Sequence, residues 1–217
     1  MSGIRTILCF GDSNTHGTVA MRDPDDMRRF PRDVRWPGVL RAELGAGWEV
    51  IEEGHPGRTT VQDDPIEGPH KNGLTVLPAL LETHRPIDLV IMMLGTNDLK
   101  AAFGVSAYDI GKATSRLLSC VAGSTSGPDQ VAPTVLLVSP VPITETGWLA
   151  EMFLGGRAKS LDVAGYLRGI AEKNGLPFVD AAELATVDPV DGIHLSADGH
   201  HSIGRALADR IRAGEVI

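Results

Sequence analysis

Positions 89–94 hold six consecutive apolar residues, Leu-Val-Ile-Met-Met-Leu, the longest apolar run in the chain. A run without alternating polar residues is typical of a β-strand that is buried on both faces. Such strands occur in parallel sheets, because the helical crossovers between parallel strands cover both sides of the sheet. The run therefore predicts an α/β protein with helices on both faces of a parallel sheet.

The rest of the chain alternates short apolar runs with helix-length amphipathic segments, and no repeat of 20–50 residues is visible. Strands are predicted at 6–10, 49–52, 88–94, 135–139 and 177–180, and helices at 37–44, 72–84, 108–122 and 159–173. Ser196 is the predicted N-cap of a last helix. Loops are expected at 18–34, 61–71, 123–133 and 140–156. All of these loops except 123–133 follow strands and are candidates to rim a site.

Length and charge narrow the class of protein. At roughly 150 residues per domain, the 217 residues predict a single domain over 1–217. The 28 acidic and 20 basic residues give a net charge of −8. This charge argues against nucleic acid as a partner, because phosphate binding requires a basic surface. It also argues against a peripheral protein of anionic membranes.

Three observations bear on the cellular compartment. The longest apolar run, six residues, is far below the roughly 18 that a membrane-spanning helix needs. The first ten residues lack the charged, apolar and cleavage regions of a signal peptide. Cys9 and Cys120 lie among apolar neighbours and are expected to be buried free thiols. These observations predict a soluble, cytoplasmic protein without a membrane partner.

Polar, glycine-containing segments follow the predicted strands. They are Gly-Asp-Ser-Asn-Thr-His-Gly at 11–17, Gly-His-Pro-Gly-Arg-Thr-Thr at 54–60, Gly-Thr-Asn-Asp at 95–98 and Asp-Gly-Ile-His at 191–194. Open α/β sheets bind ligands outside the carboxyl ends of their strands. We therefore expect the four segments to converge on one edge of the sheet.

The segment at 11–17 does not fit three common glycine motifs. A P-loop needs four residues between its glycines and then Lys-Ser/Thr, but five residues separate Gly11 from Gly17, and Thr18 follows. The nucleophile elbow Gly-x-Ser-x-Gly would need glycine at position 15, which is threonine. Gly-x-Gly-x-x-Gly is also absent, so phosphate and dinucleotide binding have no support.

The residue types in these segments match those of serine-based acyl transfer. Taken singly, Ser13 is an ordinary helix cap, and Asn97 or the Asp191–His194 pair are ordinary turn residues. Together, Ser13, His194 and Asp191 supply a nucleophile, a base and a group to orient that base. The backbone N–H groups of Ser13 and Gly57 and the Asn97 amide supply three donors for an oxyanion.

The blocks around Ser13, Gly57, Asn97 and His194 resemble the four blocks of the SGNH hydrolases, also called GDSL-type lipases and esterases. They occur in that order and span most of the chain. Segments at 7–13, 33–36, 49–54 and 94–98 are further similar to the bacterial arylesterase and acyltransferase branch. The resemblance implies a flavodoxin-like, three-layer α/β/α sandwich with a central parallel sheet of about five strands.

The resemblance also implies roles for individual residues. Ser13 would be the nucleophile and His194 the base, positioned by Asp191. Ser13, Gly57 and Asn97 would form the oxyanion hole; Gly57, which precedes Arg-Thr-Thr, matches the second block better than Gly54. Candidates for the substrate pocket are Asp12, Asn14, Trp148, Phe153 and Ile193. Asn14 stands where many members have leucine. The apolar cluster of Trp148, Met152, Phe153 and Leu154 fits a core, a pocket lip or a subunit contact.

The function expected from these features is a serine esterase of small-acyl or aryl esters that works through an acyl-enzyme, with transfer to alcohols left open. A carbohydrate acetyl esterase is the first alternative, followed by a lysophospholipase or thioesterase. A non-catalytic binding module on the same scaffold would not require every catalytic part. We expect a small-molecule ester substrate, no cofactor and a homo-oligomer.

Histidines are scattered along the chain, at positions 16, 55, 70, 84, 200 and 201 as well as 194. No spacing among them matches a zinc site. We therefore predict no metal and interpret the six additional histidines as ordinary surface or capping residues.

Overall fold

The computed structural model describes residues 3–217 and contains a five-stranded, all-parallel sheet with the strand order β2-β1-β3-β4-β5. The strands are β1 (Arg5–Gly11), β2 (Trp48–Gly54), β3 (Leu89–Met93), β4 (Thr134–Val138) and β5 (Phe178–Val179). This order is that of flavodoxin-like folds. The predicted α/β class, parallel sheet and number of strands are confirmed.

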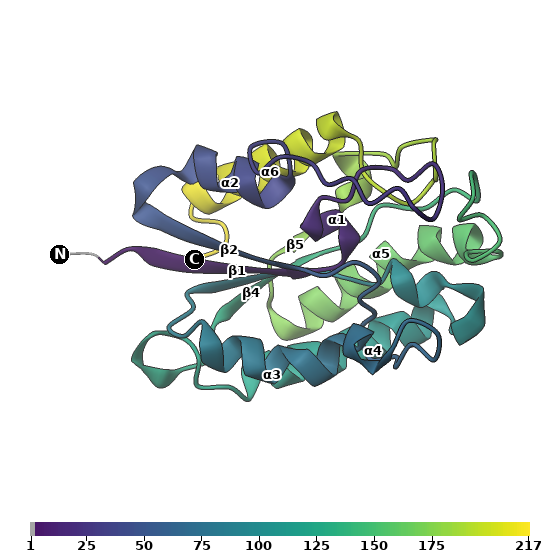
Figure 1. The fold of residues 1–217 in the computed structure, drawn as a ribbon. Helices are drawn as coiled ribbons and strands as arrows, with labels where there is room; N and C mark the ends of the chain where they lie inside the picture. The colour runs from purple at the N-terminus through teal and green to yellow at the C-terminus, as the bar shows by residue number, and fades with distance from the viewer. Residues whose placement is uncertain (1–2) are drawn as a thin grey trace.

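Helices cover both faces of the sheet (Figure 1). One face carries α2 (Trp36–Leu44) and α6 (Ala197–Arg212), and the other carries α3 (Gly73–Thr83), α4 (Ala107–Ala122) and α5 (Gly156–Asn174). Successive strand residues point to opposite faces. Ile7 and Cys9 of β1 therefore join the core under α2 and α6, whereas Leu8 and Phe10 join the other core. All five residues of β3 are buried, as the apolar run at 89–94 predicts.

The predicted elements are all present, and their ends are shifted by no more than three residues. Sequence analysis did not predict the four-residue helix α1 (Ser13–His16), which directly follows β1. Its N-cap is Asp12 rather than Ser13. Cys9 is buried as predicted, but Cys120 is only partly buried, which corrects the prediction of two buried thiols.

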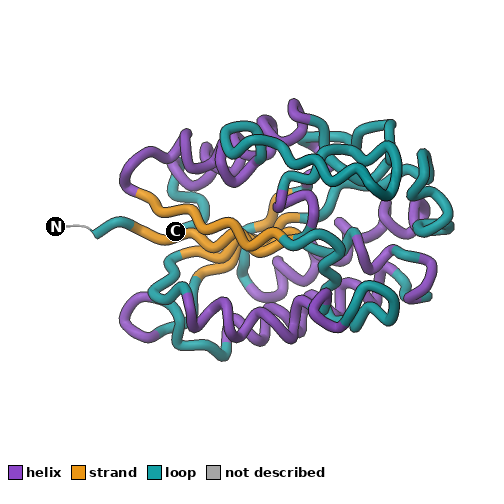
Figure 2. The backbone as a smooth tube through the Cα atoms, in the orientation of Figure 1, coloured by secondary structure: helices purple, strands orange, loops and turns teal. Residues whose placement is uncertain are grey.

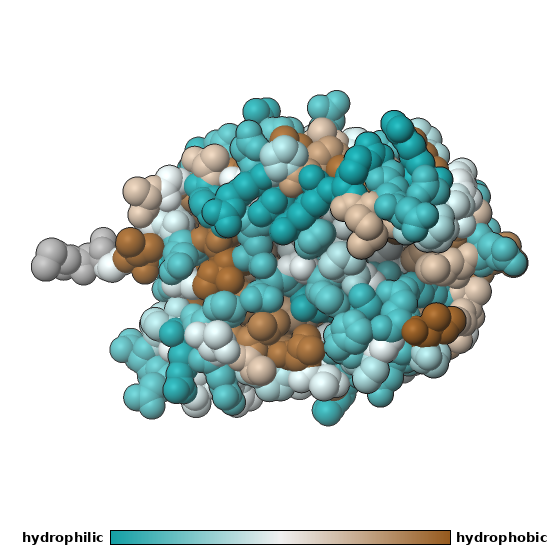
Figure 3. All heavy atoms as spheres, in the orientation of Figure 1, coloured by the Kyte–Doolittle hydropathy of each residue, from teal (hydrophilic) through white to brown (hydrophobic). Residues whose placement is uncertain are grey.

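The strands' carboxyl ends lie opposite the N-terminal end of the described chain, and long loops gather there (Figure 2). The molecular face drawn in Figure 3 is mostly hydrophilic, with small hydrophobic patches separated from one another. Among residues 3–217, the helices are all too short or too polar to cross a membrane.

Candidate active site

A cavity of about 170 Å³ brings residues from the loops after β1, β2, β3 and β4 together with the 191–194 segment. Its lining consists of Ser13, Thr18, Met21, Pro56, Gly57, Glu67, Asn97, Lys100, Trp148, Leu149, Met152, Phe153, Ile193 and His194. The site lies where the strand order reverses between β1 and β3, the usual ligand position in this topology. The four polar segments predicted to converge all contribute to it.

A larger surface hollow of about 490 Å³ lies between α4 and α5. Ser115 and Ser119 line it, but no histidine or carboxylate accompanies them. A serine hydroxyl needs a neighbouring base to become a nucleophile. The smaller cavity at the strand ends contains both groups and is therefore the candidate active site.

Ser13 occupies the first position of α1, immediately after β1. The carboxylate of Asp12 caps this helix by accepting a hydrogen bond from the Asn14 N–H at 2.9 Å. Burial raises the pKa of Asp12 to about 6. Ser13 is 4% exposed, and its hydroxyl makes no hydrogen bond to any residue in 3–217. The hydroxyl is thus held at the cavity without a competing partner.

His194 is paired with Asp191, as the sequence predicts from their spacing. The two atoms Nδ1 of His194 and Oδ2 of Asp191 are 2.5 Å apart, and both side chains are buried. Burial alone would raise the pKa of Asp191, but the hydrogen bond and charge of His194, with backbone N–H donors, lower it below its usual value. The ionised carboxylate therefore fixes the ring and its Nδ1 proton, which leaves Nε2 to act as the base.

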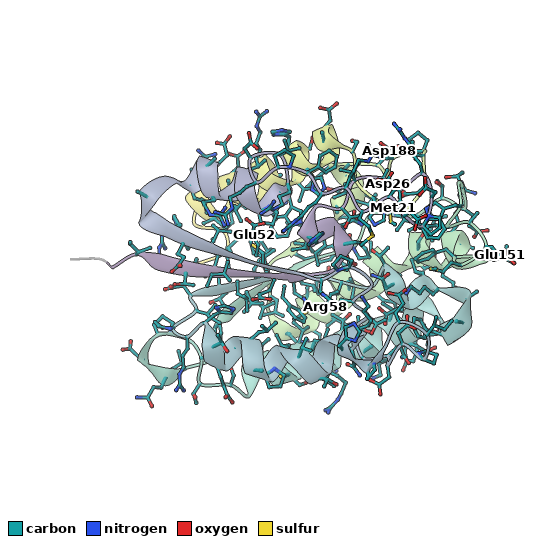
Figure 4. The ribbon with its side chains drawn as sticks, in the orientation of Figure 1. Met21, Asp26, Glu52, Arg58, Glu151 and Asp188 are labelled. Atoms are coloured by element: carbon teal, nitrogen blue, oxygen red, sulfur yellow. The ribbon has the colours of Figure 1, made fainter. Side chains whose placement is uncertain are left out.

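A backbone contact that the sequence does not reveal also holds Asp191. The Met21 N–H donates to Asp191 Oδ2 at 2.7 Å. Met21, labelled in Figure 4, lies in the loop after α1 and also lines the cavity. Because the donor is a main-chain group, no side-chain pattern could have indicated it.

Asn14, a predicted substrate-pocket candidate, bonds to the backbone on both sides of His194. Its Nδ2 donates to the Ile193 carbonyl at 3.1 Å, and its Oδ1 accepts from the Leu195 N–H at 2.9 Å. These bonds clamp both sides of His194 to the helix that carries Ser13. Asn14 and Asp12 are not among the described residues that line the cavity. No hydrogen bond joins Ser13 to His194 here, and in unliganded enzymes this contact is often long.

Gly57 and Asn97 line the same cavity as Ser13. Gly57 has φ 78°, a conformation that favours glycine. The Asn97 Nδ2 group donates to the Arg58 carbonyl at 3.0 Å, so its second hydrogen is free for a ligand. Gly54 is packed elsewhere, since a side chain there would lie 2.1 Å from the His16 backbone nitrogen. Of the two glycines considered, the structure places Gly57 at the site.

Arg58 and Asp98 hold the oxyanion segments together, although sequence analysis assigned them no role. The Arg58 guanidinium donates to the Gly11 carbonyl at 2.9 Å and lies 4.6 Å from the centre of the Phe10 ring (Figure 4). Burial lowers the pKa of Arg58 to about 10. Asp98 accepts from the Thr60 N–H at 2.9 Å. Arg58 lies in the segment 54–60 and Asp98 in the segment 95–98, so their positions in the sequence motifs could have indicated a role.

The first prediction concerns Asn97. Removing one oxyanion donor typically lowers kcat by about 100- to 1000-fold, so we expect Asn97→Ala to show this loss with KM within a few-fold. The variant also leaves the buried Arg58 carbonyl without its donor, at a cost of about 1–3 kcal/mol. Asn97→Asp should be slower still, because a carboxylate repels the oxyanion. Steady-state kinetics and thermal unfolding of both variants check this; a normal kcat in the folded fraction would make Asn97 purely structural.

The comparison with protein families matches residues 9–201 to the GDSL-like Lipase/Acylhydrolase family. The chain belongs to this family. It is a carboxylic ester hydrolase, as the family and the solved structures similar to it indicate. The comparison with curated proteins found no match.

Two solved structures illustrate the relationship of this GDSL-like hydrolase to known proteins. The inhibitor-bound aryl esterase of M. smegmatis is 44% identical, with a TM-score of 0.92, over 96% of this chain and 99% of that chain. Est24, a carbohydrate acetylesterase from Sinorhizobium meliloti, is 39% identical with the same TM-score and the same coverage. The resemblance inferred from the sequence is confirmed.

The wall of the cavity in this GDSL-like hydrolase is largely apolar. The pocket candidates Trp148, Phe153 and Ile193 line it, together with Met152 of the same apolar cluster and Leu149, which the sequence pattern does not single out. All but Ile193 come from the loop at 140–156. That loop therefore contributes pocket lining in addition to core packing.

Charged side chains form another part of the wall. Lys100 is 4% exposed, and its Nζ lies 3.0 Å from Asp64 Oδ2 and 2.5 Å from Glu67 Oε1. The pairing keeps a buried ammonium from being left without a partner. Lys100 lies two residues beyond the 95–98 segment, and only its closeness in sequence to Asn97 could have indicated it.

Among the additional histidines, His200 is a buried residue that binds the first N–H of α2, and is not a surface residue. It is fully buried, and its Nδ1 accepts a hydrogen bond from the Trp36 N–H at 3.3 Å. Burial lowers the pKa of His200 to about 3. Within 3–217, no three His, Cys, Asp or Glu side chains are grouped so as to hold a metal ion.

Proposed function

We propose that this esterase hydrolyses small-acyl or aryl esters through an acyl-enzyme on Ser13. The observation that carries the proposal is that one small cavity is lined by Ser13, His194, Gly57 and Asn97 together. The Asp191–His194 pair and the three oxyanion donors, the N–H groups of Ser13 and Gly57 and the Asn97 amide, supply what a serine nucleophile needs.

In the proposed reaction, Ser13 Oγ attacks the ester carbonyl carbon while His194 Nε2 takes the hydroxyl proton. The carbonyl π electrons move to oxygen, and the N–H groups of Ser13 and Gly57 and the Asn97 amide bind the resulting oxyanion. When the tetrahedral intermediate collapses, the C–O bond to the alcohol breaks and His194 protonates the leaving oxygen. Water then repeats the sequence on the acyl-enzyme, which releases the acid and restores Ser13.

The cavity size supports short acyl groups. Pockets for drug-sized ligands enclose about 300–1000 Å³, whereas this cavity encloses about 170 Å³. The likeness to an aryl esterase supports aryl leaving groups. A carbohydrate acetyl esterase is the second candidate, supported by the likeness to Est24 and by the charged Glu67 and Lys100 at the cavity.

A panel of substrates tests this proposal. The panel contains nitrophenyl esters from acetate to decanoate, acetylated sugars, and acetate esters with added alcohol acceptors. The substrates are compared by kcat/KM and by analysis of the products. We expect a burst of nitrophenolate and a loss of roughly 10-fold or more between butyrate and octanoate, because excess methylenes do not fit. Higher activity on octanoate would contradict the short-acyl proposal. Faster turnover of acetylated sugars than of nitrophenyl esters would favour a carbohydrate acetyl esterase. New esters formed with the added alcohols would show that the enzyme also transfers acyl groups.

We further propose that the chain forms homo-oligomers. Met27, Ile66 and Leu154 support this, since these apolar residues are 82%, 84% and 66% exposed, and removing apolar surface from water favours association between proteins. Sedimentation velocity checks it: a single species of 23.1 kDa would contradict the proposal.

The unpaired cysteines Cys9 and Cys120 support a reducing, cytoplasmic compartment, which fractionation of expressing cells would test.

A further inference from the structure

Residues 55–58 form a tight turn that presents Gly57 to the cavity. The Arg58 N–H donates to the His55 carbonyl at 3.0 Å. Proline at the second position and glycine with φ 78° at the third are typical of a type II turn. Because the peptide unit is planar and trans, the Pro56 carbonyl and the Gly57 N–H point in opposite directions. The direction of the carbonyl therefore determines where the N–H points.

The side chain of Lys71 holds this carbonyl. Its Nζ donates to the Pro56 oxygen at 2.8 Å, and it is the one donor to that oxygen within residues 3–217. The aliphatic stem lies over Gly57, with Cε 3.2 Å from where a side chain would begin. On the opposite side of the peptide, the Gly57 N–H has no hydrogen-bond acceptor among the described residues, although Gly57 lines the cavity.

The backbone of Lys71 is itself fixed. Lys71 ends the 3-10 turn Pro69–Lys71, and its carbonyl accepts from the Thr59 N–H at 2.9 Å. Its ammonium also lies 3.5 Å from Glu67 Oε2 and 3.4 Å from His55 Nε2. The side chain is 13% exposed. Lys71 is therefore anchored to the segment next to the oxyanion site and is largely screened from water.

A peptide before glycine has two accessible orientations, because glycine adopts positive and negative φ with similar ease. A flipped Pro56–Gly57 peptide would turn its carbonyl oxygen toward the cavity, where it would repel an oxyanion. A positive charge at the Pro56 oxygen disfavours the flipped form. It also polarises the amide, which makes the Gly57 N–H a stronger donor.

We propose that Lys71 is a positioning residue for the oxyanion hole, orienting and polarising the Pro56–Gly57 peptide so that the Gly57 N–H binds the oxyanion. The inference rests on the proposed function, since it requires Gly57 to be an oxyanion donor. Lys71 contacts neither the nucleophile nor the base, and acts through Gly57.

The test compares Lys71→Met, which keeps the stem without the charge, with Lys71→Arg, whose guanidinium can also donate to the carbonyl. Lys71→Gln is a second neutral variant. Lys173→Met, an exposed position on α5, is the matched control. Each is assayed for kcat and KM on nitrophenyl acetate, for the rate of inactivation by an aryl phosphonate whose tetrahedral oxygen occupies the oxyanion site, and for thermal unfolding.

Loss of a whole oxyanion donor lowers kcat by about 100- to 1000-fold, and here the donor remains but is misoriented part of the time. We therefore expect Lys71→Met and Lys71→Gln to lose roughly 10-fold in kcat and in phosphonate inactivation, with KM within about twofold. Lys71→Arg should recover most of the loss, and Lys173→Met should match the wild type.

A kcat of Lys71→Met equal to that of the wild type would overturn the proposal. The proposal would also be overturned if Lys71→Met and Lys71→Arg lost equal kcat and both had a lowered melting temperature, because the loss would then come from reduced stability. Ser13→Ala separates this failure from failure of the proposed function. If the wild type depends on Ser13 but not on Lys71, only the Lys71 inference is wrong. If Ser13→Ala turns over the ester as fast as the wild type, the proposed function itself is wrong.

Discussion

Ser13→Ala is expected to lower kcat by at least about 1000-fold and to remove the burst, because loss of the nucleophile of a serine triad disables the whole unit. The melting temperature should stay near that of the wild type. The Ser13 hydroxyl makes no hydrogen bond among residues 3–217, and the cap of α1 is Asp12. Kinetics on nitrophenyl acetate and thermal unfolding measure both effects.

Cys9 is the neighbouring nucleophile that could complicate this result. It lies on β1, is fully buried in the core under α2 and α6, and burial raises the pKa of its thiol well above the usual value. It should therefore stay protonated and out of reach of substrate. Retention of more than about one per cent of wild-type kcat in Ser13→Ala would contradict the assignment of Ser13.

Asp191→Asn is expected to lower kcat by up to about 10 000-fold, because the amide favours the wrong tautomer of His194 and gives no charge to stabilise the imidazolium. The fully buried Asp191 accepts four hydrogen bonds, from the N–H groups of Met21, Ile193 and His194 and from the His194 ring. The amide oxygen of asparagine can still accept from the Ile193 and His194 N–H groups, which bond to Oδ1. The amide nitrogen cannot accept from the Met21 N–H or the His194 ring, which bond to Oδ2, so stability should fall by about 1–3 kcal/mol. Kinetics and denaturant unfolding separate the two effects.

The same substitution should change the dependence of stability on pH. The folded-state pKa of Asp191 lies below its usual value. Its stabilising contribution is therefore present above the unfolded pKa of about 4 and is lost as pH falls through the lower folded value. Asp191→Asn should lack this part of the acid-dependent loss.

His194→Ala is the companion variant and should be at least as slow as Asp191→Asn. An unchanged kcat would place the base elsewhere, with His16 as the first alternative to examine. The structure disfavours His16, which is outside the cavity lining and bonds through Nδ1 to Thr18 Oγ1 at 3.1 Å.

The sheet was predictable because its strands can be recognised from local patterns of apolar residues. The run at 89–94 has no polar residue, and its length of six residues favours a strand buried on both faces over a helix. Element ends were less predictable, since the terminal residues depend on capping contacts. Asp12 and Ser13 are both good N-caps by type, and in the structure it is the Asp12 carboxylate that accepts from the Asn14 N–H.

The motif residues of the site were predictable from their positions after strands, but the contacts that hold them were not. Asn14 binds Ile193 and Leu195, which are 179 and 181 residues away along the chain. Met21 acts through its backbone, and Lys71 reaches Pro56 from a neighbouring turn. These contacts follow from the assembled topology, whereas sequence spacing reports only local neighbours.

Covalent chemistry at Ser13 is the central step of the proposed reaction. Wild-type protein and Ser13→Ala are treated with an aryl phosphonate, and each is analysed by intact mass and peptide mapping. We predict one adduct per chain on the peptide containing Ser13 in the wild type and none in the variant. An adduct on another residue, or an equal adduct on Ser13→Ala, would contradict the account.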